Sequence, residues 1–530
     1  MRSSRLRGGR IYVGGCDGET AKRESAIVPR GTGPIVQNTE STPYRHRIGG
    51  ESPPVPVYGG RAIPGCARRF ESAPPAIGFG TCFGPPPLGF APSRPLSSGP
   101  FLSAVILTLV FSWRIGLELR SGSRSLGGPR KILYLDNTTT FGGAINSLAE
   151  LVAGLDPSRF TPIVATPQPE ATLRERLPGI ETRRVRPVPH RSAPRTGRPG
   201  LESSGPRSRS STFGQDRAKT ALRLLGETSP EALQIARLAR REGAELIHLN
   251  NNLESQEAGV LAARLIGLPC VAHARSFQVG TRFLRWIARR VDRHVAISNA
   301  IAQNLRDLGI PESRIVLIHD GIRCDRFADV PSRHECRVAL GIPSGSFAFG
   351  IFGRLVPWKG IAEFVEVAAE IVRSDPDATA FVVGSVSDGD DDYYDTLRER
   401  VNSLGLADRI VFTGFRPDVR QAMAAMDLVV HASTEPEPFG MVLIEAMSLG
   451  RPIVATRGGG PEDIVLHGET GLLVERGAIR EMRNAIVELR ENPERARAMG
   501  EKGRDRVRTN FSAEIHTSRV SRMYDELLKE

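Results

Sequence analysis

The two glutamates Glu437 and Glu445 stand where they could bind the two ends of one ligand. Pro436 and Pro438 keep a helix from starting before about Phe439, so Glu437 is expected in the loop above that helix. Glu445 then falls about five residues inside the helix, roughly 8 Å further along its axis. The unpaired amides of the first helical turn lie between the carboxylates and favour an anion. This layout fits a sugar–diphosphate–ribose ligand; a helix N-terminal charge plus one buried glutamate is the alternative.

Two cations and two glycines also follow predicted strands. Arg354 comes just after the strand predicted at Phe347–Phe352, and Lys359 opens the next helix. This edge of a parallel sheet is where α/β folds bind ligands, and each cation could contribute on the order of 4 kcal/mol toward a diphosphate, before desolvation. Gly142 and Gly143 end a strand-to-helix turn, where backbone amides can approach an anion closely. Solvated charges and a tight turn are the alternatives.

Parallel sheets are needed to position these residues, and the sequence predicts two. Short apolar strands alternate with helices from Lys131 and again from about Ser346, which predicts two α/β domains, at 131–335 and 336–530. Strands are predicted at Lys131–Asp136, Pro162–Ala165, Leu246–Leu249, Cys270–His273, His294–Ile297, Phe347–Phe352, Ala378–Val383, Ile410–Thr413, Leu428–His431 and Ile453–Thr456. Helices are predicted at Gly143–Leu155, Glu254–Ile266 and Asn299–Leu308.

The formal net charge of +12 belongs mostly to the N-terminal extension, residues 1–130. That stretch has seventeen Lys and Arg residues against seven Asp and Glu residues, which leaves a net charge of +2 for the other 400 residues. A nucleic-acid partner is therefore not expected for the α/β domains. A second basic, Ser/Pro/Gly-rich stretch at 187–216 is predicted to be a mobile loop within the first domain.

The extension is rich in Gly and Pro and shows no sustained helical or strand period, so we expect it to be mostly disordered. No methionine occurs between Met1 and Met423, which leaves open whether residues 1–130 belong to the native product or to a misassigned start. Its one apolar run, Phe101–Trp113, would span about 20 Å as a helix, too short for a hydrocarbon core of about 30 Å. Six cysteines without paired spacing predict reduced thiols and a cytoplasmic protein.

The segment around the two glutamates resembles the Glu-seven-Glu signature of the glycogen-synthase-like, retaining family 4 glycosyltransferases of GT-B fold. That fold has two facing Rossmann-like domains with parallel sheets, an N-terminal acceptor domain and a C-terminal nucleotide-sugar domain. The sequence departs from the family pattern at His319–Ile322, where Asn-Gly-Val is usual, at Glu435-Pro436 and at Trp358. The resemblance covers about 400 residues and extends to Gly353–Gly360, Val411–Gly414, Arg451–Thr456, Gly459–Glu462 and Gly468–Val474.

The resemblance implies a role for each candidate residue. Arg354 and Lys359 would hold the donor diphosphate and neutralise the leaving nucleotide. Glu437 would contact the donor sugar and stabilise charge near the anomeric carbon, and Glu445 would bind the ribose. His273 aligns with the histidine of the family that contacts the donor.

The remaining candidates would bind the nucleotide part of the donor. Gly142 and Gly143 belong to the glycine loop of the family, which approaches the phosphate, and Phe415 and Arg416 follow its base-contacting strand. The first turn of the signature helix, at Phe439, Gly440 and Met441, would supply amides to the phosphate.

Together these features predict retaining transfer of a hexosyl unit from a UDP- or GDP-sugar to a glycan, lipid-linked or small-molecule acceptor, without a cofactor or metal. The acidic run Asp388–Asp392 is interpreted as a solvated loop. A nucleotide-sugar epimerase of the same fold, or a non-catalytic sugar-nucleotide-binding protein, is the alternative. Basic residues between Arg183 and Lys219 are expected to allow peripheral contact with anionic lipid at the inner membrane face.

Overall fold

The computed structural model describes residues 128–137, 143–168, 177–184, 228–386 and 391–529. Most of the predicted disordered extension, Gly142, the basic loop at 187–216 and most of the acidic run therefore lie outside the described residues. At the start of the basic stretch, Arg183 lies in a short strand and pairs with Glu242 and Glu181.

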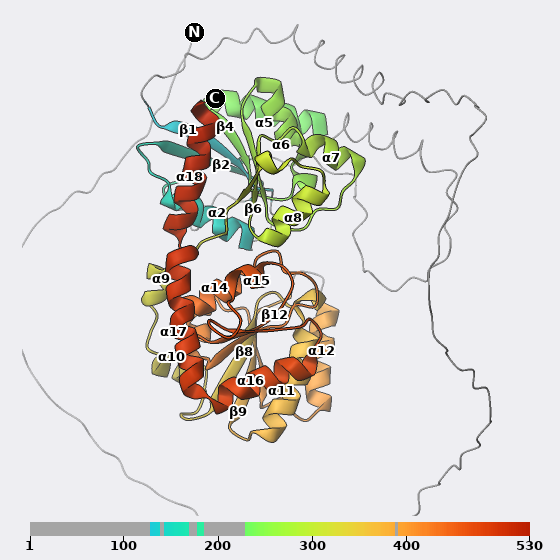
Figure 1. The fold of residues 1–530 in the computed structure, drawn as a ribbon, viewed down its shortest axis with the longest axis vertical. Coiled ribbons are helices and arrows are strands. Elements are labelled where there is room, and N and C mark those ends of the chain that lie inside the picture. The colour runs from blue at the N-terminus through green and yellow to red at the C-terminus, as the bar shows by residue number, and fades with distance from the viewer. Residues whose placement is uncertain (1–127, 138–142, 169–176, 185–227, 387–390, 530) are drawn as a thin grey trace, which may run out of the picture. The chain divides into compact units, whose positions relative to one another are not determined.

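The first sheet has seven strands within the described residues, in the order β3-β2-β1-β4-β5-β6-β7 (Figure 1). Its neighbouring strands are parallel. The chain reverses its direction of winding between β1 and β4, the kind of switch point at which α/β sheets bind ligands. The strands are β1 (Arg130–Leu135), β2 (Phe160–Thr166), β3 (Glu181–Arg184), β4 (Leu246–Leu249), β5 (Cys270–Ala274), β6 (Arg293–Ala296) and β7 (Ile315–Leu317).

The second sheet repeats this winding with six parallel strands in the part of the chain that the structure describes. Its order is β10-β9-β8-β11-β12-β13, so its switch point lies between β8 and β11. The strands are β8 (Phe347–Phe352), β9 (Ala378–Val383), β10 (Ile410–Gly414), β11 (Leu428–His431), β12 (Ile453–Thr456) and β13 (Leu472–Val474). The predicted pair of Rossmann-like α/β domains is confirmed.

Helices cover both faces of each sheet, because alternate strand residues point to opposite faces. Ile132 and Tyr134 of β1 pack with α2 and α18, while Leu133 and Leu135 pack with α5 to α8. The helices are α2 (Gly143–Gly154), α5 (Ser229–Glu242), α6 (Glu257–Ile266), α7 (Arg282–Ala288), α8 (Asn299–Asp307), α9 (Asp325–Ala328), α10 (Arg333–Ala339), α11 (Ile361–Ser374), α12 (Asp391–Ser403), α13 (Val419–Ala425), α14 (Met441–Ser448), α15 (Gly460–Ile464), α16 (Ile479–Glu491), α17 (Pro493–Asn510) and α18 (Ala513–Lys529). Short 3₁₀ turns occur at η2 (Leu253–Ser255), η3 (Glu312–Arg314) and η4 (Pro357–Lys359).

The last helix, α18, returns to the first sheet (Figure 1). The hydroxyl of Tyr524 lies 2.9 Å from that of Tyr134 on β1, and both side chains are fully buried. Val520 and Leu527 fill the same core beside α2. The sequence boundaries assign all of 336–530 to the second domain, whereas the structure packs α18 on the first, because that sheet face has apolar side chains for it to cover.

Gly360 allows the loop after β8 to pass close to the end of β11. A Cβ atom at this position would lie 1.8 Å from the carbonyl oxygen of Ala432, and the φ angle is +71°. Gly360→Ala is therefore expected to lower the free energy of unfolding by about 3 kcal/mol, since both backbone strain and overpacking act. Urea unfolding measures this loss.

Gly341→Ala provides the matched control. Gly341 has a similar φ angle of +66°, but nothing lies within 4 Å of its added Cβ. Only the backbone penalty of about 1 kcal/mol should appear there. Equal losses at the two positions would contradict the packing argument.

Candidate active site

The predicted site residues follow the two strands that flank the switch point of the second sheet. Arg354 and Lys359 follow β8, and Glu437 follows β11. The two strands are parallel neighbours, with Ile351 opposite Val430, so their carboxyl ends reach the same edge of the sheet. The structure thus brings the two predicted loops to one place.

Glu437 is the centre of a buried polar cluster. Its residue is 7% exposed, and its Oε2 atom forms an ion pair with Lys359 Nζ. His431 Nε2 and Ser433 Oγ each donate to the same oxygen at 3.2 Å. The ammonium of Lys359 also lies 4.2 Å from the ring centre of Trp358, which limits the positions that it can take.

The Glu437 carboxyl is ionised at neutral pH. Burial by itself raises its pKa, because a charge loses hydration in the interior. The hydrogen bond from His431 and the positive charge of Lys359 outweigh burial and hold the pKa at about 2. A fixed carboxylate next to a cation can accept hydrogen bonds from the hydroxyl groups of a bound sugar. It can also stabilise positive charge that develops in that sugar.

The backbone of this loop is fixed by the glycine loop after β12. The Glu437 amide donates to the Gly458 carbonyl at 3.0 Å, and the Gly460 amide donates to the Glu437 carbonyl at 2.8 Å. A Cβ atom at Gly459 would lie 2.1 Å from the Glu437 carbonyl oxygen, so only glycine fits there. The Gly459–Glu462 segment that the sequence resemblance included thus acts on Glu437 through the backbone.

Helix α14 begins at Met441, which agrees with the prediction that the two prolines keep it from starting before about Phe439. Gly440 has a φ angle of +105°, a left-handed conformation that stops the helix from extending back to Phe439. The first amides of α14 have no partner within the helix, which makes this end suited to an anion. Phe439 itself is buried and packs against other aromatic rings.

The first domain meets α14 at the same end. Ser147 Oγ lies 3.7 Å from the Met441 sulfur. A Cβ atom at Gly143, the first residue of α2, would lie 3.9 Å from Met441 Cγ. The structure therefore places Gly143 beside the start of α14; its neighbour Gly142 lies outside the described residues.

Glu445 lies one turn further along α14 and is partly exposed. Burial of its carboxyl raises the pKa to about 7, and the positive charge of Arg326 only partly opposes this. Arg326 itself pairs with Glu150 of α2 at 2.8 Å. Glu445 is thus poised to change its charge near neutral pH, unlike Glu437.

The other predicted nucleotide residues stand exposed at the same sheet edge. Arg354 is exposed, and its guanidinium makes no ion pair with a described residue. Phe415 and Arg416 follow β10, two strands away from β8, and Phe415 is 67% exposed. A large apolar side chain so open to water is suited to cover a flat, apolar ring of a ligand.

Comparison with known proteins identifies the family of the chain. Residues 332–506 match the family described as "Glycosyl transferases group 1", and residues 218–326 match "Glycosyltransferase Family 4". The chain is 30% identical over 285 residues to the lipopolysaccharide core biosynthesis mannosyltransferase LpsB of Rhizobium meliloti, over 53% of this chain and 79% of LpsB. The chain belongs to the group 1, family 4 glycosyltransferases.

Two further similarities extend over both domains of this glycosyltransferase. N-acetyl-alpha-D-glucosaminyl L-malate synthase of Bacillus anthracis is 26% identical over 309 residues, 56% of this chain and 79% of that protein. The crystal structure of Anabaena HepE in complex with UDP and glucose superposes with a TM-score of 0.62 at 25% identity, over 75% of this chain and 99% of that chain. The chain has the GT-B fold, with its two Rossmann-like sheets.

In this glycosyltransferase, His273 lies apart from the cluster around Glu437. It is the fourth residue of β5 and is fully buried, with its Nε2 atom 3.8 Å from Asp320 Oδ1. Its ring stacks on that of His516 of α18, at 5.8 Å between centroids. Burial and the charge of Arg275 lower its pKa. Neither ring nitrogen has a hydrogen-bond partner among the described residues, and the contact of His273 with the donor stays a prediction.

Two residues of the cluster around Glu437 were not predicted as site residues from the sequence. His431 ends β11, and Ser433 follows two residues later; both are buried. Thr456 of β12 lies 3.3 Å from the other ring nitrogen of His431 and thereby fixes the ring. Polar side chains at the end of a buried strand need partners. The His431-Ala-Ser433 run upstream of Glu437 could therefore have indicated, from the sequence, side chains that bind its carboxylate.

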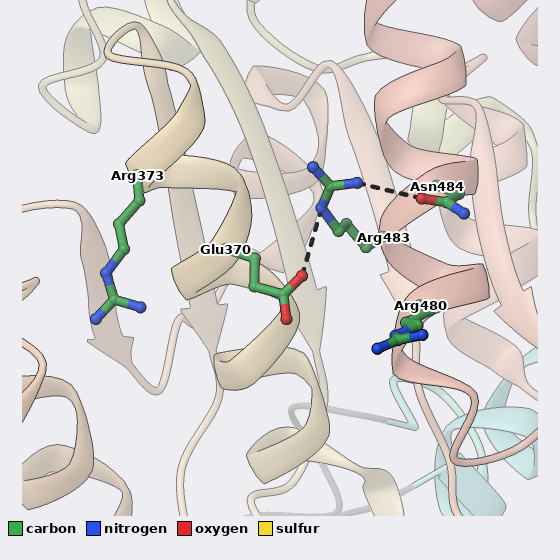
Figure 2. Close-up of a pocket in the computed structure, with 5 residues that line it drawn as sticks. All are labelled: Glu370, Arg373, Arg480, Arg483 and Asn484. Carbon is green, nitrogen blue, oxygen red and sulfur yellow. Dashed lines mark hydrogen bonds and ion pairs between the residues drawn. The ribbon is translucent and has the colours of Figure 1, made fainter. Parts of the chain in front are cut away.

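A hollow of about 410 Å³ lies elsewhere, between α11 and α16 (Figure 2). Its lining is Glu370, Arg373, Arg480, Arg483 and Asn484, and Arg483 Nε lies 3.4 Å from Glu370 Oε2. None of the predicted site residues lines it, so we assign it no part in transfer.

Metal-binding clusters and membrane-spanning helices are both absent from the described residues. No group of three or more His, Cys, Asp or Glu side chains among them is arranged to hold a metal ion. No helix in the described part of the chain has the length and apolar character needed to span a membrane.

Proposed function

We propose that this glycosyltransferase moves a hexosyl unit from a UDP- or GDP-sugar to a glycan, lipid-linked or small-molecule acceptor. Transfer would retain the anomeric configuration and need no metal ion. A cytoplasmic location, with peripheral contact to anionic lipid through the basic stretch at Arg183–Lys219, belongs to the same proposal.

The ion pair of Lys359 with the buried, ionised Glu437 supports this proposal most directly. The pair puts one positive and one negative group at the switch point of the second sheet, next to the amide end of α14. A donor with a negative diphosphate and a sugar that gains positive charge during transfer would need both.

Each side chain then has one task during transfer. Lys359 and Arg354 would neutralise the diphosphate as its bond to the sugar lengthens, together with the amides near Gly143 and Met441. Glu437 would lie against the sugar and stabilise the positive charge near the anomeric carbon. Glu445 would accept hydrogen bonds from the ribose, and Phe415 with Arg416 would contact the base.

The relatives support a nucleotide-sugar donor, but their acceptors differ from one another. LpsB is a mannosyltransferase of lipopolysaccharide core biosynthesis, and the Bacillus anthracis protein is an N-acetyl-alpha-D-glucosaminyl L-malate synthase. The HepE crystal holds UDP and glucose. For this chain we therefore propose a UDP- or GDP-sugar and keep the acceptor open.

Thermal shift with a panel of UDP-, GDP- and ADP-sugars, each with and without EDTA, tests the proposal. A donor at about a hundred times its dissociation constant should stabilise the fold by about 2.7 kcal/mol. The best donor is then incubated with candidate acceptors, and NMR of the product reads the anomeric configuration. A product with inverted configuration would contradict the proposal. Epimerised donor would indicate an epimerase, and binding without transfer or hydrolysis would indicate a sugar-nucleotide-binding protein.

Phe415→Ala is expected to weaken binding of UDP about tenfold, because stacking of a base on an aromatic ring contributes about 1–3 kcal/mol. Phe415 is 67% exposed, so its truncation should leave the fold nearly unchanged. Val338 of α10 is 65% exposed, and Val338→Ala serves as the control. Titration calorimetry with UDP measures both; affinity of Phe415→Ala within twofold of the control would remove Phe415 from the base site.

A further inference from the structure

One side chain of the first domain contacts both loops that hold Glu437. His319 follows β7, and its Nε2 atom donates to Asp463 Oδ2 of α15 at 2.9 Å. The side chains are 17% and 8% exposed, respectively, so water competes little for this bond. Asp463 also accepts from the backbone amide and the side-chain amide of Asn299, at the start of α8, at 2.7 and 3.1 Å. A single carboxylate of the second domain is thus held by two residues of the first.

The ring of His319 makes a second contact with the second domain. It stacks on Phe439, with centroids 6.0 Å apart and planes 28° apart. Phe439 lies two residues after Glu437, and a Cβ atom at Gly460 would lie 2.1 Å from its carbonyl oxygen. The His319 carbonyl also accepts from His516 Nδ1 of α18 at 2.8 Å, which fixes the backbone of His319 to the first domain.

These contacts connect His319 to two segments that are themselves joined around Glu437. The 437–439 loop and the start of α15 are joined by backbone hydrogen bonds and by the close approach of the glycines at 459 and 460. His319 holds one of them by a hydrogen bond and the other by its ring. Sliding of the first domain would therefore move both loops or break one of the two contacts.

We propose that His319 is a positioning residue that sets the Glu437 loop relative to the first domain. The proposal rests on the proposed function, in which Glu437 acts on the donor sugar. His319 itself would touch neither donor nor acceptor. Its loss should affect the geometry of transfer more than the affinity for the nucleotide, since the phosphate and base contacts lie on other residues.

His319→Ala is expected to lower kcat about a hundredfold, the loss that a displacement of about 1 Å can cause, with the donor KM within about threefold of wild type. His334, an exposed histidine of α10, gives the control His334→Ala. His319→Gln keeps a side-chain N–H donor, and His319→Phe keeps a stacking ring. Each should recover at least about tenfold of the lost turnover.

Asp463→Ala completes a double-mutant cycle with His319→Phe, because each of these variants removes one partner of the hydrogen bond. If the hydrogen bond links the two domains, the double variant should lose little more turnover than either single variant. Additive losses would show that the two side chains act separately and would overturn the role of the bond.

Hydrogen exchange of backbone amides tests this inference without depending on transfer activity. Backbone amides at 437–443 and 459–463 should exchange at least about tenfold faster in His319→Ala than in wild type or His334→Ala. If His319→Ala does not fold, His319→Phe takes its place, and the faster exchange is then expected at 459–463, where the hydrogen bond is lost. Unchanged exchange, or turnover within threefold of wild type, would overturn the inference. Faster exchange in a protein that transfers sugar from no donor would overturn the proposed function and leave the positioning contact in place.

Discussion

Alanine in place of Lys359 is expected to lower kcat for sugar transfer by roughly two to three decades, the effect of removing one preorganised charge from a developing anion. The variant would lose the cation that we propose faces the leaving diphosphate. It would also leave the buried Glu437 without its ion-pair partner, so the pKa of that carboxyl should rise from about 2. Initial rates of nucleotide release at saturating donor measure the change. Arg354→Ala should cause a loss of similar size.

Arg354→Ala separates the catalytic loss from a folding defect, because Arg354 is exposed and forms no ion pair with a described residue. Lys502→Ala, on the exposed side of α17, is the control for removal of a positive charge. Turnover of both site variants within about threefold of the control would count against a phosphate role for the two cations. Lys359→Arg should lie between wild type and alanine, since it keeps the charge but changes its shape.

The central strands of both sheets could be predicted from sequence because they are buried on both faces. The strands at Phe347–Phe352, Ala378–Val383, Leu428–His431 and Ile453–Thr456 begin and end where the sequence places them. A strand covered by helices on both sides is a continuous apolar run, and such a run has clear ends. The two α/β domains follow from this alternation with helices, whereas the order of the strands in each sheet required the structure.

Three edge strands of the described sheets, β3, β7 and β13, could not be predicted in the same way, whereas the fourth, β10, was predicted. β3, with the sequence Glu-Thr-Arg-Arg, has no apolar residue, and β7 and β13 are three residues each. Such strands are defined by their hydrogen bonds to a neighbouring strand. The local sequence does not show which strand that neighbour is. The return of α18 to the first domain has the same cause, since its apolar face does not reveal which sheet it covers.

Some features of the candidate site could likewise be predicted from the sequence, and others required the structure. The motif gave Glu437, Glu445, Arg354 and Lys359 as candidates, because their proposed roles depend on spacing along strands and one helix. The ion pair of Glu437 depends on two loops 78 residues apart. The difference between the two glutamate pKa values likewise depends on which groups surround each carboxyl, so it required the structure.

Glu445→Gln is expected to make the protein more stable at pH 8 and weaker in binding its donor. The pKa of Glu445 is raised from an ordinary value of 4.5 to about 7, so its stabilising contribution is complete below pH 4.5 and is lost as the pH rises through 7. The full shift would correspond to about 3 kcal/mol, and partial exposure of the side chain reduces this to about 2 kcal/mol. Glutamine cannot ionise, so the gain should be present at pH 8 and absent near pH 4.5. Urea unfolding at both pH values measures it, with the exposed Glu501→Gln as control.

The same substitution should change how donor affinity depends on pH. Between pH 6 and pH 8, Glu445 passes from mostly neutral to mostly ionised, and an ionised carboxylate is the stronger acceptor for ribose hydroxyls. Wild-type affinity for UDP-glucose should therefore rise about tenfold over this range, while the glutamine variant should show a flat profile. UDP-glucose is preferred to UDP, because a terminal phosphate titrates near pH 6 itself. A gain in stability without the loss of this pH dependence would mean that Glu445 is a strained core residue. Both effects together would mean that the fold tolerates a destabilising charge because the donor needs it.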